Sequence, residues 1–367
     1  MKIAIVVPGG VDRSGRHRVI PALLWLIERL ATDDEVHVFA LQQEERPARW
    51  PLLGAQVHNA GRRPRRLRTL GQMLGEQRRG GFDVVHAFWA GGPGVAAALF
   101  SRLTGVPALL TLPGGDLSAM ADIDYGARLT RRGRFWVDLA LREATQVIVP
   151  SEGMRDQAAT LGVDAMCIRY GVALDRWPVR TPTPRDPAAP LRLVQVANLN
   201  RVKDQGTLLG ALHVLATRGI AFELDLIGLD TLDGAVQRRC RELGLADRVR
   251  FHGFVEHEAM RPLIERADLM VLSSRHEGVP IAALEAAVAG VPTVGTAVGQ
   301  IADWAPGAAI AVPIGDAGAL ADAIERLASD DDERLRLAVN AQAFAVEHDA
   351  DAFATQMRIL YRAFGRD

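Results

Sequence analysis

Cysteine, long apolar runs and an excess of one charge are all scarce in this sequence. Its 367 residues include two cysteines, Cys167 and Cys240, and carry a formal net charge of −1. Two thiols without ligand-like spacing predict neither a disulfide framework nor a zinc site, which fits a reducing cytoplasm. The near-neutral charge argues against a nucleic-acid partner. No apolar run approaches the roughly eighteen residues of a membrane span, so we expect neither a transmembrane helix nor a signal peptide.

Short apolar runs that alternate with amphipathic helical patterns are what the chain does contain. Residues 3–7 are a continuous apolar run, as expected of a parallel strand that is covered on both faces. Repeated alternation of this kind predicts doubly wound parallel sheets, in which ligands bind at the carboxyl ends of the strands. Further strands are expected at 36–41, 84–87, 108–112, 147–149, 193–196, 223–227, 249–251, 293–295 and 309–312.

A proline-rich stretch marks the best boundary between two domains. Five prolines fall between Pro178 and Pro190, which predicts a stiff, extended linker. The sequence therefore divides into a first domain over residues 1–178 and a second domain that begins at residue 191.

The most informative stretch runs from residue 269 to residue 286. An apolar strand is followed by a polar turn, then by Glu277-Gly278-Val279-Pro280, and then by an alanine-rich helix. The free N–H groups at the start of such a helix form an anion site. Glu277 lies beside that site, and Glu285 lies about two helical turns further on among apolar neighbours. Carboxylates suit hydroxyl-rich ligand groups, although two solvated helix residues are the alternative.

Two cations follow the first strand of the second domain. Arg201 and Lys203 lie in the loop after residues 193–196, together with Asn198. Lysine as a point charge and arginine as a fork are natural partners for a diphosphate. Two ordinary surface cations are the competing interpretation.

Strand ends in the first domain carry a second set of candidates. The loop after residues 3–7 ends in Ser14-Gly15 and leads into a helix expected at 16–31; it lacks the Gly-x-Gly-x-x-Gly fingerprint, which disfavours a dinucleotide cofactor. His86 lies at the end of the strand at 84–87, where a core histidine is equally expected. Gly114 and Asp116 follow the strand at 108–112.

Two further groups of residues invite competing interpretations. The arginines from Arg62 to Arg79 could form a solvated helix face, lie on an anionic bilayer, or hold an acidic or diphosphate-linked acceptor. His252 and His257 cannot form a metalloprotease-type zinc site, because Gly253 directly after a strand prevents both from sharing one helix face.

The pattern from Glu277 to Glu285, with Ala-Gly-Val-Pro-Thr-Val at 289–294 and then Val298-Gly299, resembles the Glu-x7-Glu motif of family 4 retaining glycosyltransferases, the glycosyl transferase group 1 type. The resemblance covers nearly the whole chain. It implies a GT-B fold, an α/β architecture of two doubly wound Rossmann-like domains facing across a cleft. Residues 1–178 would bind the acceptor, with a terminal helix at 352–367 packing back on them, and residues 191–351 would bind the donor.

The same resemblance implies an activity and a set of roles. The chain would be a retaining, metal-independent hexosyltransferase that uses a UDP or GDP type of sugar donor and no other cofactor. Lys203 and Arg201 would neutralise the leaving diphosphate, while Glu277 would hold donor-sugar hydroxyls and Glu285 the ribose hydroxyls. The remaining donor-side residues would be Gly278, Val279, Asn198, His252 and Gly15, and the acceptor-side residues Ser14, His86, Gly114 and Asp116.

Four departures from the family pattern accompany the resemblance, one of them being Tyr170 in the position of an asparagine. Pro113 replaces a histidine, Asn198 replaces an arginine whose charge Arg201 would supply, and Ser14-Gly15 replaces a Gly-Gly pair. A nucleotide-sugar epimerase, a phosphorylase and a non-catalytic sugar-nucleotide-binding protein remain as alternatives. The setting of such relatives suggests bacterial polysaccharide or glycolipid synthesis, with a saccharide or lipid-linked acceptor. The enzyme would be cytoplasmic, with peripheral contact at the inner face of the cytoplasmic membrane through the segment from Arg62 to Arg79.

Overall fold

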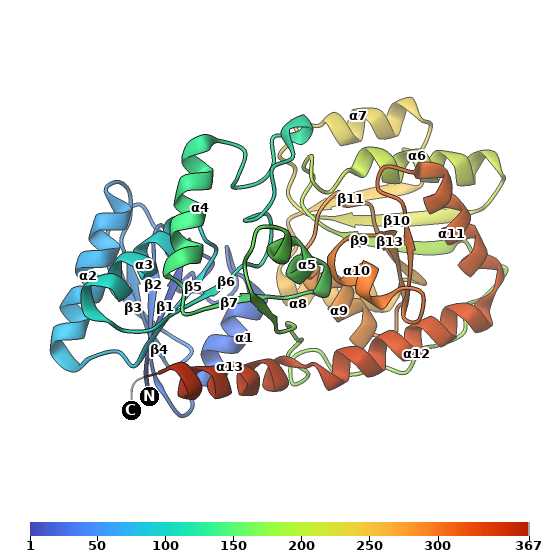
Figure 1. The fold of residues 1–367 in the computed structure, drawn as a ribbon. Coiled ribbons are helices and arrows are strands. Elements are labelled where there is room, and N and C mark those ends of the chain that lie inside the picture. The colour runs from blue at the N-terminus through green and yellow to red at the C-terminus, as the bar shows by residue number, and fades with distance from the viewer. Residues whose placement is uncertain (366–367) are drawn as a thin grey trace. The chain divides into compact units, whose positions relative to one another are not determined.

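The computed structural model of the protein describes residues 1–365 and consists of two compact units. Unit 1 takes in Met1–Tyr170 and the terminal segment from Ala350, and unit 2 takes in Gly171–Asp349. Each unit is a wholly or mostly parallel sheet covered by helices (Figure 1). The doubly wound α/β fold expected from the sequence is thus confirmed for both units.

In the described part of unit 1 the strand order is β3-β4-β2-β1-β5-β6-β7-β8, and only the β3–β4 pair is antiparallel. The central strands are apolar and buried, as the sequence pattern predicts. The strands are β1 (Lys2–Val7), β2 (Glu35–Ala40), β3 (Ala48–Leu52), β4 (Ala55–Asn59), β5 (Val84–Phe88), β6 (Ala108–Thr111), β7 (Gln146–Val149) and β8 (Ala165–Cys167). The helices are α1 (Pro21–Leu30), α2 (Arg65–Gly80), α3 (Gly92–Thr104), the short η1 (Ala121–Ile123), α4 (Arg131–Glu143), α5 (Glu152–Thr160) and α13 (Ala350–Phe364).

In unit 2 the strand order is β11-β10-β9-β12-β13-β14, and all pairs are parallel. The order reverses between β9 and β12, which is where doubly wound sheets bind ligands. The strands are β9 (Leu191–Val196), β10 (Phe222–Ile227), β11 (Val249–Gly253), β12 (Leu269–Leu272), β13 (Thr293–Thr296) and β14 (Ala309–Val312). The helices are α6 (Gln205–Thr217), α7 (Ala235–Glu242), α8 (His257–Glu265), α9 (Ile281–Val288), α10 (Gly299–Trp304), α11 (Ala317–Ser329) and α12 (Asp331–Glu347).

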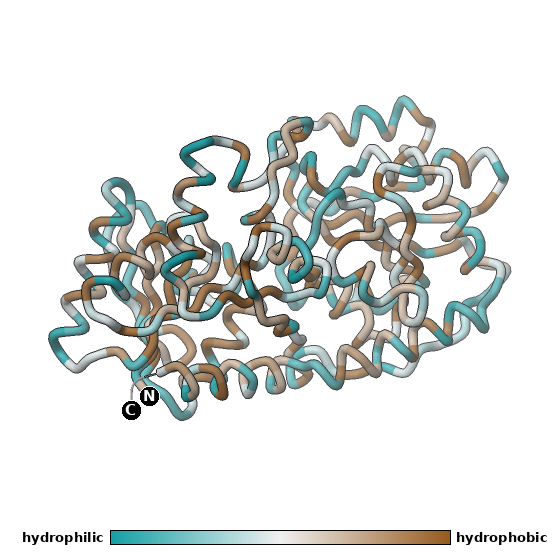
Figure 2. The backbone as a smooth tube through the Cα atoms, in the orientation of Figure 1, coloured by the Kyte–Doolittle hydropathy of each residue, from teal (hydrophilic) through white to brown (hydrophobic). Residues whose placement is uncertain are grey.

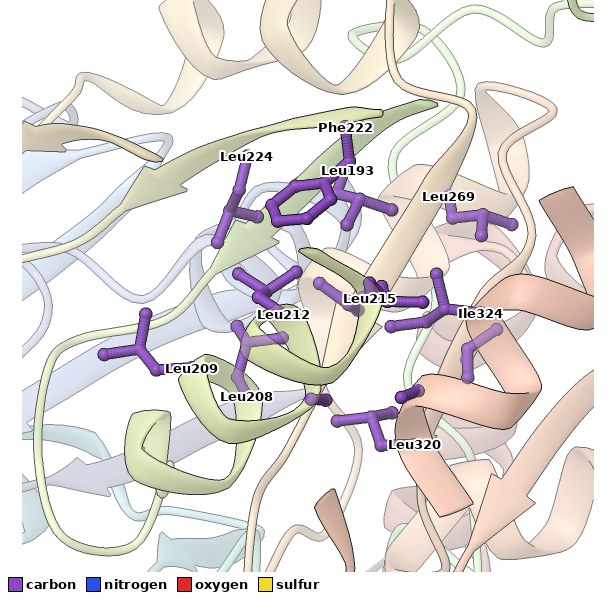
Figure 3. Close-up of a cluster of buried hydrophobic side chains, with 14 of the residues drawn as sticks. Leu193, Leu208, Leu209, Leu212, Leu215, Phe222, Leu224, Leu269, Leu320 and Ile324 are labelled. Atoms are coloured by element: carbon purple, nitrogen blue, oxygen red, sulfur yellow. The ribbon is translucent and has the colours of Figure 1, made fainter. Parts of the chain in front are cut away.

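The core of unit 2 shows how the helical period produces this packing. Leu208, Leu212 and Leu215 recur at helical spacing on one face of α6 and are buried against β9, β10 and α11 (Figure 3). Each such side chain contributes about 1.5–3 kcal/mol by leaving water. Figure 2 shows the same segregation along the backbone, with hydrophobic stretches concentrated in the strands of each sheet.

The last helix of the chain, α13, belongs to unit 1. Arg29 Nε donates to Asp351 Oδ1 at 2.7 Å, and the Tyr361 hydroxyl is 2.6 Å from His86 Nδ1. Residues 171–178, which the linker pattern assigns to the first domain, contact unit 2 instead. Trp177 is buried there with its ring 5.3 Å from that of His257.

Candidate active site

The loop between β9 and α6 presents Lys203, one of only two lysines in the chain. Its backbone is held on both sides: the amide donates to Asn200 Oδ1 at 3.0 Å, and the carbonyl accepts from Ser273 Oγ at 2.8 Å. The next residue, Asp204, caps α6 by accepting from the Thr207 amide at 3.3 Å. These bonds fix the lysine at the carboxyl end of the central strand.

Lys203 and Glu277 form an ion pair, although 74 positions separate them in the chain. Lys203 Nζ lies 2.5 Å from Glu277 Oε1, and the Ser274 hydroxyl donates to the same oxygen at 2.6 Å. Within residues 1–365 no hydrogen bond engages Glu277 Oε2. The structure therefore brings together a cation for phosphate and a carboxylate with a free oxygen for hydroxyl groups.

Helix α9 begins directly behind this pair. Pro280 is its N-cap and Ile281 its first residue, so Val279 and Pro280 precede the helix that the sequence places them in. The N-cap makes no side-chain bond and the first turn holds no acidic residue. The first amides of the helix are therefore available to an anion, as expected from the sequence.

The start of α10 holds the peptide between Gly278 and Val279 in place. Gly299 has φ +48°, and a Cβ atom there would lie 2.2 Å from the Gly278 carbonyl oxygen. The Gln300 amide donates to that oxygen at 3.1 Å. Gly278 thus serves as a backbone anchor for Glu277, and only glycine fits at position 299.

Several polar residues beneath the site were not predicted from the sequence. Ser273 Oγ accepts from Gln195 Nε2 at 3.4 Å, and Thr296 Oγ1 donates to the Ser274 carbonyl at 2.5 Å. Gln300 is buried, and neither its side-chain oxygen nor its side-chain nitrogen has a partner within the described residues. Ser273, Gln195 and Thr296 are polar residues near the carboxyl ends of apolar strands, and that position could have indicated them. Gln300 lies at the start of a helix, and nothing in the sequence pattern indicated it.

Glu285 is the most deeply buried acid of the site. It is 1% exposed, and His257 Nε2 hydrogen-bonds its Oε1. Burial raises the pKa of Glu285, while the hydrogen bond from His257 acts in the opposite direction. The sequence suggested a half-buried Glu285 in need of a partner; the structure supplies His257, for which the sequence gave no such role.

Three further candidates lie at the same end of the unit 2 sheet: Asn198 and Arg201 in the loop after β9, and His252 near the end of β11. Asn198 Oδ1 accepts from the Leu229 amide at 2.9 Å, and Arg201 is exposed. His252 Nε2 is 2.6 Å from Asp225 Oδ1, so one ring nitrogen already has a partner. Within residues 1–365, none of the three forms a hydrogen bond or an ion pair with Lys203 or Glu277.

In unit 1 the loop after β1 is tightly organised around Asp12. Asp12 Oδ1 accepts from the Ser14 amide at 3.0 Å, and Asp12 Oδ2 pairs with Arg18 Nη2 at 2.6 Å. The hydrogen bonds from Ser14 and the charge of Arg18 outweigh burial and lower the pKa of Asp12 to about 2. Gly15 takes φ +65° and donates to the Asp12 carbonyl. Because this loop extends beyond Gly15, the helix expected at 16–31 begins only at Pro21 and ends at Leu30.

His86 is not available to an acceptor in unit 1. It has no exposed surface, and its Nδ1 and Nε2 are 2.6 Å from the Tyr361 hydroxyl and 2.7 Å from Thr111 Oγ1. Burial lowers the pKa of His86 to about 3. The core-histidine interpretation fits this geometry, and the acceptor-side assignment of His86 is therefore revised.

Asp116 is a buried carboxyl group with one oxygen unused. Oδ1 accepts from the Ala90 amide at 2.8 Å, while Oδ2 has no partner within residues 1–365. Burial raises the pKa of Asp116 to about 6. Gly114 precedes it after β6, near the Tyr125 hydroxyl, so both acceptor-side candidates lie at the carboxyl end of the unit 1 sheet.

The Asp116→Asn variant should reveal how much the folded state is destabilised when the buried Asp116 carboxyl ionises. Because the folded pKa exceeds the unfolded value of 3.8, wild-type stability falls as pH rises from about 4 through about 6, by on the order of 3 kcal/mol. Asparagine does not titrate, so the melting temperature of the variant relative to wild type should rise between pH 5 and pH 8. Asp156→Asn, at an exposed position of α5, is the control; an equal change in both variants would contradict the assignment.

No metal-binding cluster and no membrane-spanning helix accompany these groups in the described chain. Over residues 1–365, no set of three or more histidine, cysteine, aspartate or glutamate side chains is arranged to hold a metal ion. None of the helices there combines the length and apolar character needed to cross a bilayer.

Models of two known domain families match the chain over most of its length. The family described as "Glycosyl transferases group 1" matches residues 190–330, and the family described as "Glycosyl transferase 4-like domain" matches residues 19–170. The chain is also 29% identical over 190 residues to the putative colanic acid biosynthesis glycosyltransferase WcaL of Escherichia coli K12, covering 49% of this chain and 46% of WcaL. It spans about half the length of this and of other curated relatives.

Solved structures show the same fold. Sucrose-phosphate synthase from Thermosynechococcus elongatus superimposes with a TM-score of 0.83 at 20% identity, covering 99% of both chains. Anabaena Alr3699/HepE in complex with UDP-glucose gives a TM-score of 0.75 at 20% identity, covering 99% of this chain and 100% of that one. The expected GT-B fold is thereby confirmed.

Proposed function

Because the chain belongs to the group 1 glycosyltransferases, we propose that it is a retaining, metal-independent hexosyltransferase. It moves a sugar from a nucleoside diphosphate donor to a hydroxyl group of an acceptor. The observation that carries this proposal is the Lys203–Glu277 ion pair beside the uncapped start of α9.

The chemical demand of the reaction falls on the leaving group. The bond between the anomeric carbon and the diphosphate oxygen breaks, and the acceptor oxygen bonds to that carbon as its hydroxyl loses a proton. Lys203, the exposed Arg201 and the first amides of α9 stabilise the negative charge that builds on the diphosphate. Glu277, with Oε2 open, accepts hydrogen bonds from donor-sugar hydroxyls.

The other candidate residues take the roles that the family resemblance implies, except where their observed contacts point to a different one. Glu285 accepts from the ribose hydroxyls, and its bond to His257 holds the carboxylate in place before the nucleotide arrives. The side-chain amide of Gln300 has no partner in the described residues and is available to the sugar. The backbone N–H of the same residue donates to the Gly278 carbonyl, which holds Gln300 beside the site. The other roles are those named for Val279, Asn198, His252 and Gly15 on the donor side and for Ser14, Gly114 and Asp116 on the acceptor side.

Donor, acceptor and location are proposed from the relatives. HepE is described in complex with UDP-glucose and WcaL as a colanic acid biosynthesis glycosyltransferase. We infer a UDP or GDP type of donor, no resident metal or other cofactor, and a saccharide or lipid-linked acceptor of bacterial polysaccharide or glycolipid synthesis. The protein would act in the cytoplasm, with peripheral contact with an anionic membrane through the segment from Arg62 to Arg79. Epimerase, phosphorylase and non-catalytic alternatives are not favoured by these relatives.

A donor screen tests the proposal. The purified protein is incubated with UDP-, GDP- and ADP-sugars, with and without a bacterial glycan and lipid extract, and nucleoside diphosphate release is measured. Release that depends on both one donor and the extract, with the sugar recovered on a new acceptor, is expected. If no donor is bound or turned over, the enzyme assignment fails; if sugar is altered without transfer, an epimerase or phosphorylase is the better assignment.

A further inference from the structure

Four arginines at the starts of two helices of unit 1 line one cavity that the reaction described above does not use. The cavity measures about 510 Å³, and its walls are Arg63, Pro64, Arg65, Arg66, Leu67 and Arg132. Five of these residues lie at or just before the start of α2, while Arg132 comes from the first turn of α4. The sequence placed the basic stretch on one helix and gave no sign that α4 contributes.

The positive charges of this arginine cavity are not neutralised by the protein. Within residues 1–365, no carboxylate lies within ion-pair distance of Arg63, Arg65, Arg66 or Arg132, whereas Arg62 pairs with Glu45 at 3.6 Å just outside it. Arg65 donates to the neutral Gln42 amide oxygen at 2.6 Å, and the Arg66 guanidinium lies 5.2 Å from the centre of the Trp136 ring. Burial, followed by the charges of Arg65 and Arg132, lowers the pKa of Arg66. The four cations are held together against their mutual repulsion.

The backbone around the cavity also favours an anion. The N-cap of α2, Pro64, makes no side-chain bond, and neither α2 nor α4 has an acidic residue in its first turn. The uncapped start of α2 therefore directs unopposed partial positive charge to this region, while at the start of α4 the Thr130 hydroxyl already accepts from the Gly133 amide. A Cβ atom on Gly92, at the start of α3, would lie 3.8 Å from Arg66 Nε. The cavity thus lies at the carboxyl end of the unit 1 sheet, the end at which Ser14, Gly114 and Asp116 lie.

We propose that the arginine cavity binds a phosphate group, as a phosphomonoester or diphosphate, that the acceptor carries. This inference rests on the proposed function, in which unit 1 receives the acceptor. Planar guanidinium groups match phosphate oxygens with paired hydrogen bonds, and a group with two or more negative charges is needed to offset four cations. Leu67 and Phe135, both more than half exposed, lie on the same two helices. Both a soluble sugar phosphate and a phosphate-bearing lipid match this chemistry, and the experiment separates these two sources.

Binding is measured by titrating inorganic pyrophosphate into the protein by calorimetry, with all variants made on a Lys203→Ala background to weaken binding at the donor site. The test variant is Arg66→Gln/Arg132→Gln, which removes one cavity arginine from each helix. The matched control is Arg78→Gln/Arg131→Gln, which removes one exposed arginine from each of the same helices outside the cavity. Melting temperatures show that each variant is folded.

The test variant should bind pyrophosphate at least about tenfold more weakly than the background, and the control within about twofold. Equal weakening by both variants, or by neither, would overturn the proposal. A second arm measures co-sedimentation with phosphatidylcholine vesicles and with the same vesicles containing phosphatidic acid, which displays a phosphomonoester. Cavity-dependent binding to the second vesicles supports a lipid source, and pyrophosphate binding without it supports a soluble source.

Donor hydrolysis by the Arg66→Gln/Arg132→Gln variant with Lys203 intact separates this inference from the proposed function. If donor hydrolysis and pyrophosphate binding are both unchanged in this variant, the proposal that the arginine cavity binds phosphate fails, while the proposed function stands. Absence of donor turnover in the wild type would overturn the function itself.

Discussion

Replacing Lys203 by alanine should lower kcat/KM for sugar transfer by about 10²- to 10³-fold. The loss removes a fixed cation from the position where the diphosphate gains charge, and such groups are typically worth this much. It also leaves Glu277, which is largely buried, without its cationic partner. Transfer kinetics with the donor identified by the screen measure the effect.

Two variants accompany this measurement. Lys203→Arg keeps the charge but changes its shape, so it should retain part of the activity. Arg241→Ala removes an exposed cation on α7 of the same unit and should leave kcat/KM unchanged. A Lys203→Ala enzyme with wild-type kinetics would remove Lys203 from the site.

Replacing His257 by alanine should destabilise unit 2 by about 3–5 kcal/mol at pH 8, or roughly 10 °C in melting temperature. The substitution leaves the fully buried Glu285 carboxylate without its partner. The pKa of Glu285 is already raised in the folded protein, so its protonated form is the better tolerated one. The destabilisation should therefore be smaller at pH 5 and grow as pH rises.

The double variant Glu285→Gln/His257→Ala is the control for this effect. Glutamine fills the same space without a charge, so it should recover much of the lost stability and remove the pH dependence, while the lost packing on Trp177 persists. Thermal melts of both variants and wild type at pH 5 and pH 8 complete the measurement. A single variant that melts like the double variant at both pH values would show that the Glu285–His257 contact has no energetic role.

The alternation of strands and helices could be read from the sequence because buried parallel strands are continuous apolar runs and the helices have an apolar face. Lys203 and Glu277 could also be found, since each follows such a strand and therefore reaches the carboxyl end of the sheet. Their direct pairing could not be found, because it depends on how the β9 and β12 loops meet in space.

The errors share the same physical origin. His86 lies near the carboxyl end of β5, as the retained candidates lie near the ends of other strands, yet it is buried in the core and hydrogen-bonded to Tyr361, 275 positions later. Gln300 and His257 carry no pattern of their own; their importance comes from burial and from partners distant in the chain. Arg132 is likewise tied to the basic stretch of α2 only by tertiary structure.

A crystal structure of the protein with the nucleoside diphosphate of its donor tests the assigned site most directly. The terminal phosphate should lie within about 3 Å of Lys203 Nζ and beside the first amides of α9. The ribose hydroxyls should lie within hydrogen-bonding distance of Glu285. A nucleotide bound elsewhere, with Lys203 still paired only to Glu277 and Glu285 only to His257, would contradict the assignment.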